Sequence, residues 1–292
     1  MGSRGSVGRD PCAGPAPGRW VDPGTIGWSG RLARATRPEV QAVQVLGHRG
    51  ARLVAPENTV EAFRAAMDEG ADGVELDVRQ TADGALVCFH DAALGRTTDG
   101  RGLLREHTLA EVATLDAGAS PRQPGARRFR GVRIPTLAEA LDALPPDALI
   151  DVEVKARGEG QQGPKDVAAA LAGVLAGRGD SARVMVSSFS RRVAAAAAAE
   201  LPGIRIGLIS PSFVPLGRAL RTAEGAGCSV LAAHFAAYFG PKAKAAARRA
   251  TDEGVLLLAW TVDDPQVAAR LADLGVAVVV SDQPGRLIRS VD

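Results

Sequence analysis

The chain has 292 residues, of which 46% are hydrophobic and 23% are charged, and its formal net charge is only +2. This composition is typical of a globular domain, and the length suits a single α/β barrel. Nucleic acids and anionic membranes bind concentrated basic faces, so the nearly balanced charge argues against both as default partners, and no apolar run is long enough to span a bilayer.

The chain begins with a segment of unusual composition. Residues 1–40 are rich in Gly, Pro and Arg and lack the apolar core of a signal peptide. We predict that they form a disordered extension, followed by one domain over residues 43–292. The three cysteines, Cys12, Cys88 and Cys228, are far apart and lack metal-ligand spacing. They predict free thiols in a reducing compartment, the cytoplasm.

From residue 43 onward, short β-branched runs alternate with Ala-rich helical patterns. This alternation indicates βα units that build a parallel sheet with helices outside it. The nearly continuous apolar strands fit a sheet that is buried on both faces. The predicted strands are Val43–Leu46, Gly73–Arg79, Ala85–Phe89, Leu149–Val154, Val184–Ser188, Ile204–Ile209, Val230–Ala233, Val255–Trp260 and Val276–Val280. The predicted helices are Thr59–Glu69, Thr136–Leu144, Val167–Leu175, Arg191–Glu200, Lys242–Glu253 and Pro265–Leu274.

These strands are one more than an eight-stranded barrel uses. The turn dipeptide Asp83-Gly84 explains the surplus, because it predicts a hairpin between Gly73–Arg79 and Ala85–Phe89. Segment 92–131 then interrupts the alternation and is polar, so we expect it to lie over the mouth of the barrel. The sequence therefore predicts a TIM (β/α)8 barrel with a small insertion after the second barrel strand. A Rossmann-like open sheet is the alternative, but no glycine fingerprint follows the first strand.

Three carboxylates occupy two strands that are neighbours in the predicted barrel. Glu75 and Asp77 are two residues apart, so their side chains point to the same side of the strand. Glu153 has the equivalent place on the next barrel strand. Such acids repel one another unless a cation or a proton lies between them, and their oxygens favour Mg²⁺ or Ca²⁺. Pairing with Arg or Lys at the barrel rim is the alternative for any single acid pair.

Two of the four histidines flank these acids. His48 and His90 each end a strand, and the hairpin brings His90 opposite the acidic strand. Imidazole titrates near neutrality, so two rings at one site can act as base and acid. His107 lies in the polar insertion and is expected at the surface, and His234 is not expected to line the pocket.

An ordered series of short motifs resembles the glycerophosphodiester phosphodiesterase family, a branch of the phospholipase-C-like TIM barrels. The resemblance runs from Val45 to about Ile288, and the ordered series is far more specific than any one motif. In chain order the motifs are His48-Arg49-Gly50, Pro56-Glu57-Asn58-Thr59, Glu75-Leu76-Asp77, His90-Asp91, Arg96-Thr97-Thr98, Leu115-Asp116-Ala117-Gly118, Ile134-Pro135-Thr136-Leu137, Glu153-Val154-Lys155, Ser187-Ser188-Phe189, Trp260-Thr261-Val262 and Ser281-Asp282.

The resemblance implies a role for each of nine residues. His48 and His90 would form a general acid/base pair, and Glu75, Asp77 and Glu153 would bind one divalent cation. Arg49 and Lys155 would bind the phosphate. Phe189 and Trp260 would form an apolar wall for the glycerol group. The implied reaction is the hydrolysis of a small glycerophosphodiester to sn-glycerol 3-phosphate and an alcohol. The nucleophile would be water or the substrate's own glycerol hydroxyl.

One position departs from the family pattern. Asp263 follows Trp260-Thr261-Val262, where the family commonly carries Asn, and this acid would either disfavour an anionic substrate or face solvent. Two other functions stay open. A lysophospholipase-D-like enzyme would need an apolar entrance for an acyl chain. A non-catalytic ligand-binding barrel is disfavoured by the retention of both histidines and all three acids.

Overall fold

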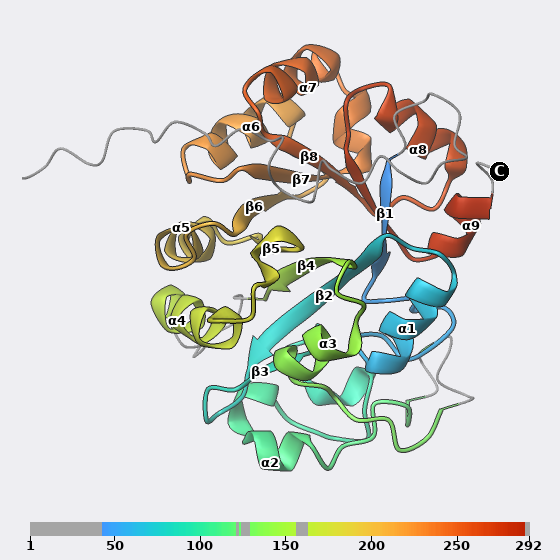
Figure 1. Ribbon diagram of the computed structural model, residues 1–292, viewed down its shortest axis with the longest axis vertical. Coiled ribbons are helices and arrows are strands. Elements are labelled where there is room, and N and C mark those ends of the chain that lie inside the picture. Colours follow the sequence, from blue (N-terminus) through green and yellow to red (C-terminus); the bar gives the residue numbers. More distant parts are fainter. Residues whose placement is uncertain (1–42, 121–122, 124–128, 156–162, 290–292) are drawn as a thin grey trace, which may run out of the picture.

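The computed structural model describes residues 43–120, 123, 129–155 and 163–289, and the predicted N-terminal extension lies outside these ranges. Strands and helices alternate along the described chain (Figure 1). The strands are β1 (Gln44–His48), β2 (Gly73–Gln80), β3 (Leu86–Cys88), β4 (Leu149–Val154), β5 (Val184–Ser188), β6 (Arg205–Ser210), β7 (Val230–His234), β8 (Leu256–Trp260) and β9 (Val278–Ser281). The α-helices are α1 (Val60–Asp68), α2 (Leu109–Val112), α3 (Leu137–Ala143), α4 (Pro164–Leu175), α5 (Arg191–Glu200), α6 (Leu216–Glu224), α7 (Ala243–Asp252), α8 (Pro265–Ala272) and α9 (Pro284–Arg289).

Eight of the described strands form a closed parallel barrel. Their hydrogen-bonded order is β1-β9-β8-β7-β6-β5-β4-β2, and a further pairing between β1 and β2 closes the ring. β3 pairs antiparallel with β2 outside the ring. At the turn between them, Gly84 has a φ of 86°, which glycine adopts without strain. The predicted TIM barrel and the predicted hairpin are therefore confirmed.

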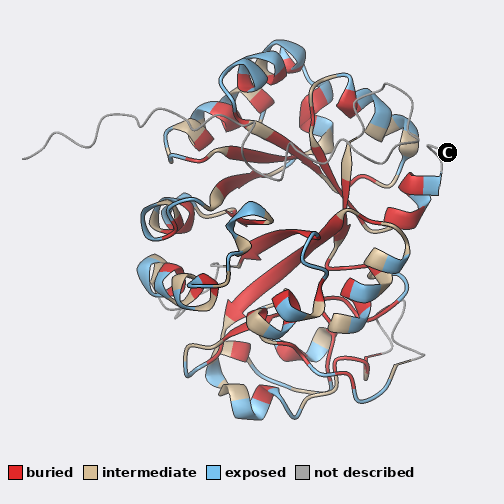
Figure 2. Ribbon diagram, viewed as in Figure 1, coloured by how far each residue is buried: buried red, intermediate tan, exposed pale blue. Residues whose placement is uncertain are grey.

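The barrel has an inner and an outer core. Figure 2 shows the strands buried, whereas the helices are buried toward the strands and exposed on the other side. The outer core lies between strands and helices. Apolar side chains fill part of the barrel interior, and they are Leu46, Leu149, Met185, Ile209, Val230, Ala232, Leu258, Val278 and Val280. Complete burial of one such side chain contributes about 1.5–3 kcal/mol, so both layers stabilise the ring.

The insertion after β3 has a small core of its own. It contains two 3₁₀ turns, η2 (Leu94–Arg96) and η3 (Leu104–Glu106), followed by α2. Thr108 and Glu111 form a capping box at the start of α2. The apolar side chains beneath these turns are Val87, Phe89, Leu94, Leu104, Val112, Ala117, Val132 and Ile134. This packing holds η2 and η3 beside the end of β2.

The structure differs from the sequence prediction at a few elements. α6 and α9 were not predicted. α6 buries its residues at the i, i+3, i+4 spacing of a helix, but it follows two prolines, and α9 is too short to show a period. β1 continues to His48, so this histidine pairs directly with Glu75 of β2. Cys88 and Cys228 are free thiols, as expected, and both are buried. No helix in the described ranges is long and apolar enough to cross a bilayer.

Candidate active site

The register between β2 and β4 brings the three predicted acids together. Asp77 is paired with Glu153, and Glu75 lies one inward position earlier on β2. One oxygen of each of the three carboxylates lies within 4.8 Å of the others. Asp77 is fully buried, and Glu75 and Glu153 are 4% and 8% exposed. Three buried acids thus share one small space at the barrel mouth.

Two basic side chains, Arg49 and Lys155, contact this acidic cluster, and both of them contact Asp77. The Nε atom of Arg49 lies 3.1 Å from Asp77 Oδ2. The ammonium of Lys155 lies 3.0 Å from Asp77 Oδ1 and 2.5 Å from Glu153 Oε1. Burial alone would raise the pKa of Asp77, but Arg49 and Lys155 outweigh it and hold this pKa below its usual range. Pairing with basic side chains, the alternative raised by the sequence, therefore does occur at this acid.

At the other two acids the nearby cations do not outweigh burial and the repulsion between carboxylates. Burial, together with repulsion from Asp77 and Glu153, raises the pKa of Glu75 well above its usual value. Burial and repulsion from Asp77 also raise the pKa of Glu153 to about 7. Glu75 Oε1 is buried and has no hydrogen-bond partner among the described residues. Three acids whose negative charge Arg49 and Lys155 offset only in part form a set of hard oxygen donors, so the acidic cluster can hold a divalent metal ion.

His48 is held by an aspartate from the other end of the chain. Its Nδ1 lies 2.6 Å from Asp282 Oδ1, and its Nε2 lies 4.0 Å from Glu75 Oε2. A carboxylate only accepts hydrogen bonds, so we assign the hydrogen to Nδ1, which leaves Nε2 toward the acids. Burial lowers the pKa of His48, and the hydrogen bond to Asp282 offsets part of this effect.

His90 has an equivalent arrangement just after β3, before the insertion begins. Its Nδ1 lies 2.6 Å from Oδ1 of Asp91, the next residue. Asp91 in turn accepts hydrogen bonds from the guanidinium of Arg96. The backbone carbonyl of His90 accepts from Arg79 Nε at 2.7 Å. Both the ring and the backbone of His90 are therefore fixed, with Nε2 left to exchange a proton.

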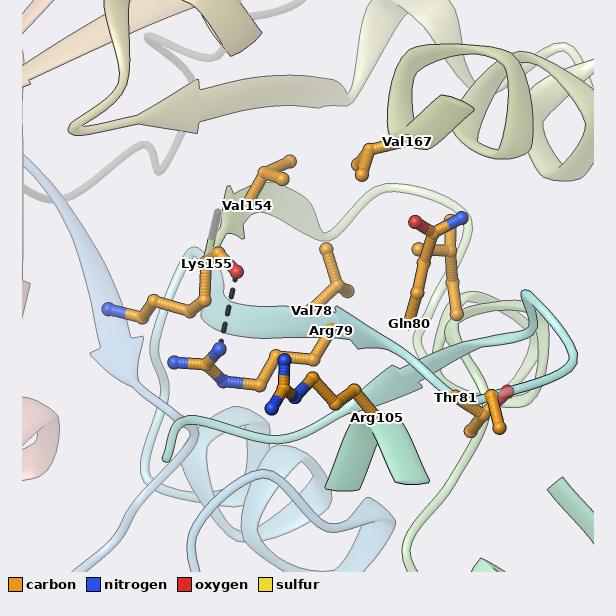
Figure 3. Close-up of a pocket in the computed structure, with 10 residues that line it drawn as sticks. Val78, Arg79, Gln80, Thr81, Arg105, Val154, Lys155 and Val167 are labelled. Carbon is orange, nitrogen blue, oxygen red and sulfur yellow. Dashed lines mark hydrogen bonds between the residues drawn. The ribbon is translucent and has the colours of Figure 1, made fainter. Parts of the chain in front are cut away.

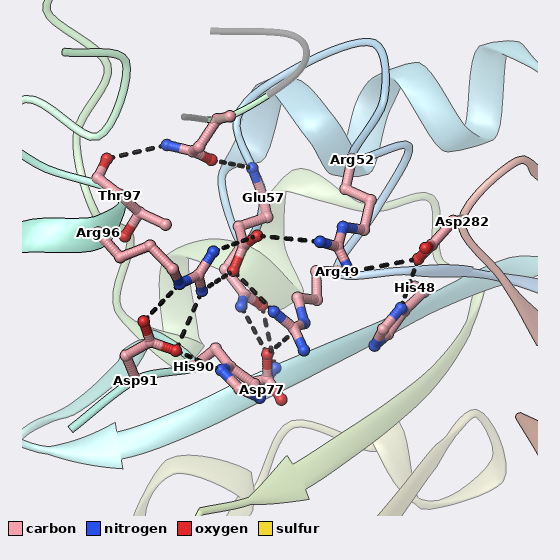
Figure 4. A network of polar contacts seen from close by, with 12 residues as sticks. His48, Arg49, Arg52, Glu57, Asp77, His90, Asp91, Arg96, Thr97 and Asp282 are labelled. Atoms are coloured by element: carbon pink, nitrogen blue, oxygen red, sulfur yellow. Dashed lines mark hydrogen bonds and ion pairs between the residues drawn. The ribbon is translucent and has the colours of Figure 1, made fainter. Parts of the chain in front are cut away.

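A buried glutamate joins the two sides of the site. Glu57 accepts two hydrogen bonds from Arg96, at 2.6 and 3.0 Å, and a third from Arg49 Nη1 at 2.8 Å. Burial opposes the charge of Glu57, but Arg96 and Arg49 together lower its pKa. In Figure 4, Arg49 and Asp77 lie between the imidazoles of His48 and His90. One polar network thus links the acid cluster to the insertion.

The loop between β1 and α1 orients Arg49 and Asn58 toward the acids, and it does so with unusual backbone angles. Arg49, Gly50 and Asn58 all have positive φ, at 57°, 79° and 58°. At Gly50 a Cβ would lie 2.4 Å from the carbonyl carbon of Ala62, so only glycine fits there. In this conformation Arg49 N donates to Glu75 Oε2 at 2.9 Å. Asn58 Nδ2 donates to Asp77 Oδ2 at 2.7 Å, and Asn58 Oδ1 accepts from Asp77 N at 3.0 Å.

The two predicted wall residues lie against each other beside the acids. The rings of Phe189 and Trp260 meet edge to face with centroids 5.7 Å apart. Lys155 Nζ lies 5.9 Å from the centre of the Phe189 ring, which places this wall beside the cation cluster. His234, which was not expected at the pocket, packs edge-on against Trp260 at 5.3 Å. It thus supports the wall from behind Trp260 and also stacks on Phe235.

Asp263 is partly exposed and has a structural role that the sequence did not suggest. Its Oδ1 accepts hydrogen bonds from Ser281 Oγ at 2.8 Å and from the backbone N of Asp282 at 2.9 Å. It therefore holds the loop that carries the aspartate bound to His48. His107 lies in the insertion, partly exposed, with Nε2 3.1 Å from the carbonyl oxygen of Arg101.

Five polar residues of the site received no catalytic or positioning role from the sequence: Glu57, Asn58, Asp91, Arg96 and Asp282. The sequence contained a signal for one of them, Asp91, because an aspartate directly after a strand-end histidine can accept a hydrogen bond from its ring. The others belong to quoted motifs, but their partners lie on distant segments, and no local pattern identifies such pairs.

Comparison with known proteins identifies the family of this chain. The model of the Glycerophosphoryl diester phosphodiesterase family matches residues 48–286. The chain belongs to this family. A glycerophosphodiester phosphodiesterase of Caldanaerobacter subterraneus is 34% identical over 252 residues, which cover 85% of this chain and 97% of that protein. A glycerophosphodiester phosphodiesterase of Bacillus subtilis is 28% identical over 83% of this chain and 84% of its own length.

A solved structure resembles the whole described barrel. A phosphodiesterase from Oleispira antarctica, solved in complex with the product sn-glycerol-3-phosphate, superposes with a TM-score of 0.74. It is 31% identical, and the match covers 85% of this chain and 96% of that one. As a member of the glycerophosphodiester phosphodiesterase family, the protein is a phosphoric diester hydrolase.

Proposed function

We propose that this enzyme hydrolyses small glycerophosphodiesters to sn-glycerol 3-phosphate and an alcohol in the cytoplasm, with one Mg²⁺ or Ca²⁺ ion and the imidazoles of His48 and His90. One observation carries the proposal. Each histidine is bound at Nδ1 by an aspartate, and the two rings flank three buried acids. The product bound to the Oleispira antarctica phosphodiesterase supports the choice of substrate.

The proposed chemistry divides the work among the residues of the site. A divalent ion bound by Glu75, Asp77 and Glu153 would polarise a phosphoryl oxygen and screen its charge. Arg49 and Lys155 add positive charge for the phosphate.

The two histidines move the protons. One imidazole accepts the proton of the nucleophile at Nε2, and the other donates a proton from Nε2 to the leaving alkoxide. Asp282 and Asp91 hold the ring orientations and stabilise the imidazolium forms. Water and the glycerol hydroxyl both suit this scheme as nucleophile. Phe189 and Trp260 would pack against the glycerol carbons.

A release assay tests the function and the metal together. The purified protein is dialysed against EDTA and incubated with glycerophosphocholine, and sn-glycerol 3-phosphate is measured before and after Mg²⁺ or Ca²⁺ is added. We expect no product without an ion and rapid release with one. Full activity after exhaustive EDTA treatment would contradict the metal site. No release with either ion would favour the non-catalytic barrel.

Replacement of either histidine tests the acid/base assignment. We expect His48→Ala and His90→Ala each to lower kcat by roughly 10²–10⁴-fold, the range for a lost general acid or base, with a nearly unchanged melting temperature. His107→Ala is the matched control, because this histidine lies in the insertion, and it should keep the wild-type rate. A kcat within twofold of wild type for His48→Ala or His90→Ala would remove that residue from the mechanism.

One observation favours a second candidate, a lysophospholipase-D-like activity. The loops that follow β1 and β6 expose Leu53, Val54 and Phe213, at 41%, 47% and 83%. These loops leave the carboxyl ends of their strands, where the acids also lie, so an acyl chain could contact them. The same assay with lysophosphatidylcholine, followed by choline release, decides between the two. Faster turnover of the lysolipid than of glycerophosphocholine would make it the better substrate.

A further inference from the structure

One buried carboxylate of the site has no part in the proposed chemistry. Glu57, in the loop between β1 and α1, neither binds the metal nor moves a proton there, although only 7% of it is exposed. Its backbone N donates to Gln123 Oε1 at 2.9 Å. Gln123 Nε2 in turn donates to the carbonyl oxygens of Thr97 and Ala117, at 2.8 and 2.7 Å. The insertion therefore fixes the backbone position from which the Glu57 side chain extends.

A linear series of contacts runs from Glu57 to His90 (Figure 4). Glu57 accepts from Arg96 Nη2 at 2.6 Å and from Arg96 Nη1 at 3.0 Å. The same guanidinium donates from Nε and Nη2 to Asp91, whose Oδ1 lies 2.6 Å from His90 Nδ1. Among the described residues, Arg96 forms ion pairs with no other acid. The position of Arg96, and with it the orientation of Asp91, therefore depends on Glu57.

The backbone of His90 is held by a separate set of contacts. Arg79 donates from Nε to the carbonyl oxygen of His90 at 2.7 Å and from Nη1 to that of Lys155 at 3.4 Å. Figure 3 shows the second of these bonds, between β2 and the residue that follows β4. Because Arg79 fixes the main chain here, the property left for Asp91 to determine is the orientation of the His90 ring.

His48 has only a looser connection to the same glutamate. Arg52 Nη2 lies 3.7 Å from Glu57 Oε2, and Arg52 Nη1 lies 3.4 Å from Asp282 Oδ1, which is bound to His48. Both distances are longer than any printed above for the contacts that lead from Glu57 to His90, and hydrogen bonds weaken with length. The geometry therefore makes the ring of His90 depend on Glu57 more than the ring of His48.

We propose that Glu57 is a positioning residue for His90 and acts through Arg96 and Asp91. The inference rests on the proposed function, because it concerns one of the two histidines that would move protons. A carboxylate can accept from every N–H group that faces it, whereas an amide at this place would turn its own N–H2 toward an arginine. Arg96 would then lose part of its support, and the His90 ring would leave the orientation that proton transfer needs.

Glycerophosphocholine hydrolysis by the metal-loaded enzyme tests the proposal. We expect Glu57→Gln to lower kcat by roughly 10–100-fold, the range for a lost partner of a functional side chain. KM should change by less than about threefold, because Arg49 keeps its contact with Asp77 and still binds the phosphate. Glu61→Gln is the matched control, since this exposed glutamate of α1 lies outside the site, and it should keep the wild-type kcat.

Double-mutant cycles test the route of the effect. Asp91→Asn combined with Glu57→Gln should be no slower than Asp91→Asn alone, because Glu57 acts on the ring through Asp91. The same cycle with Asp282→Asn should show a smaller coupling. Arg96→Lys keeps the charge but cannot bridge two carboxylates, so it should reproduce the loss in kcat. Its side chain is 35% exposed, so this variant is informative even where Glu57→Gln does not fold.

Each outcome bears either on this inference or on the function beneath it. A wild-type kcat in folded Glu57→Gln or in Arg96→Lys, or a loss confined to KM, overturns the positioning role. Losses that multiply in the Asp91 cycle, or a coupling to Asp282 at least as large as that to Asp91, overturn it as well. All of these results leave the proposed function standing. Absence of hydrolysis by the wild-type enzyme overturns the proposed function itself.

Discussion

The two halves of the barrel interior differ in the residues at their inward-facing strand positions, which are acidic in one half and apolar in the other. On β2 and β4 the inward positions toward the mouth carry acids, namely Glu75, Asp77, Asp151 and Glu153. On β6 to β9 the interior is apolar, with Ile209, Val230, Ala232, Leu258, Val278 and Val280. The apolar half removes hydrocarbon from water and so stabilises the ring. The acidic half opposes folding, because burial raises the pKa of both Asp151 and Glu153 to about 7. The acidic half that carries the site therefore lowers the stability of the fold, and the apolar half compensates for this loss.

Among the variants that test this contrast between the two halves, the largest effect is expected from breaking the acidic half. Glu75→Gln keeps the shape of the side chain but removes one charge of the predicted metal site. We expect kcat/KM at saturating metal to fall by roughly 10²–10³-fold, as when one main electrostatic contact is lost. The metal-free protein should melt at a higher temperature, since a buried, repelled carboxylate is gone. A variant that is both active and less stable would show that the two halves do not differ in this way.

The reverse result is expected in the apolar half. Leu258 is 1% exposed within the inner core. Leu258→Ala leaves a cavity and should lower the free energy of unfolding by about 2–5 kcal/mol in urea titrations. Its kcat/KM at 25 °C should stay within about twofold of wild type, because the acids are on other strands. Loss of activity in the folded variant would mean that the apolar half also shapes the site.

The pH dependence of stability sharpens the contrast. Glu153 and Asp151 have pKa values of about 7 in the folded protein, above the usual carboxyl value of about 4. Between these values the folded state binds more protons than the unfolded state, so the free energy of unfolding should fall as pH rises from about 4 to about 7. Urea titrations of the metal-free protein at several pH values measure this slope.

Two controls accompany that experiment. Leu258→Ala should shift the whole stability curve without changing its slope, since it alters no titrating group. Saturating Mg²⁺ or Ca²⁺ should flatten the slope, because a bound cation favours the charged carboxylates. Stability that rises with pH in the metal-free protein would contradict the pKa directions assigned to these acids.

The smallest effect concerns the acid that departs from the family pattern. Asp263 acts through two accepted hydrogen bonds, and an Asn oxygen can accept both. We expect Asp263→Asn to change kcat/KM by less than about threefold, and Asp263→Ala to lower it about tenfold by releasing Asp282 from its position beside His48. The difference between the Asn and Ala variants should appear in kcat and in the pH profile of kcat. Equal rates for Asp263→Ala and wild type would show that Asp282 holds His48 without this support.

Most of the fold was readable from local patterns. Strand and helix periods predicted the barrel order, and the Asp83-Gly84 turn predicted the hairpin that carries His90 toward β2. α6 was missed, although its buried residues follow the helical period, because prolines and a glycine lie at its start. Its packing against the barrel decides the conformation there, and that packing is not local information.

What the sequence by itself determined is which residues share a face, because a strand has a period of two. It therefore placed Glu75 with Asp77, and with Glu153 once the order of the strands was predicted. Only the tertiary structure decided the partners of these groups. Asp282 meets His48 across 234 positions, and Glu57 meets Arg96 across 39. Such pairs depend on the closure of the ring and on the positive φ angles of Arg49 and Asn58, which no spacing in the sequence specifies.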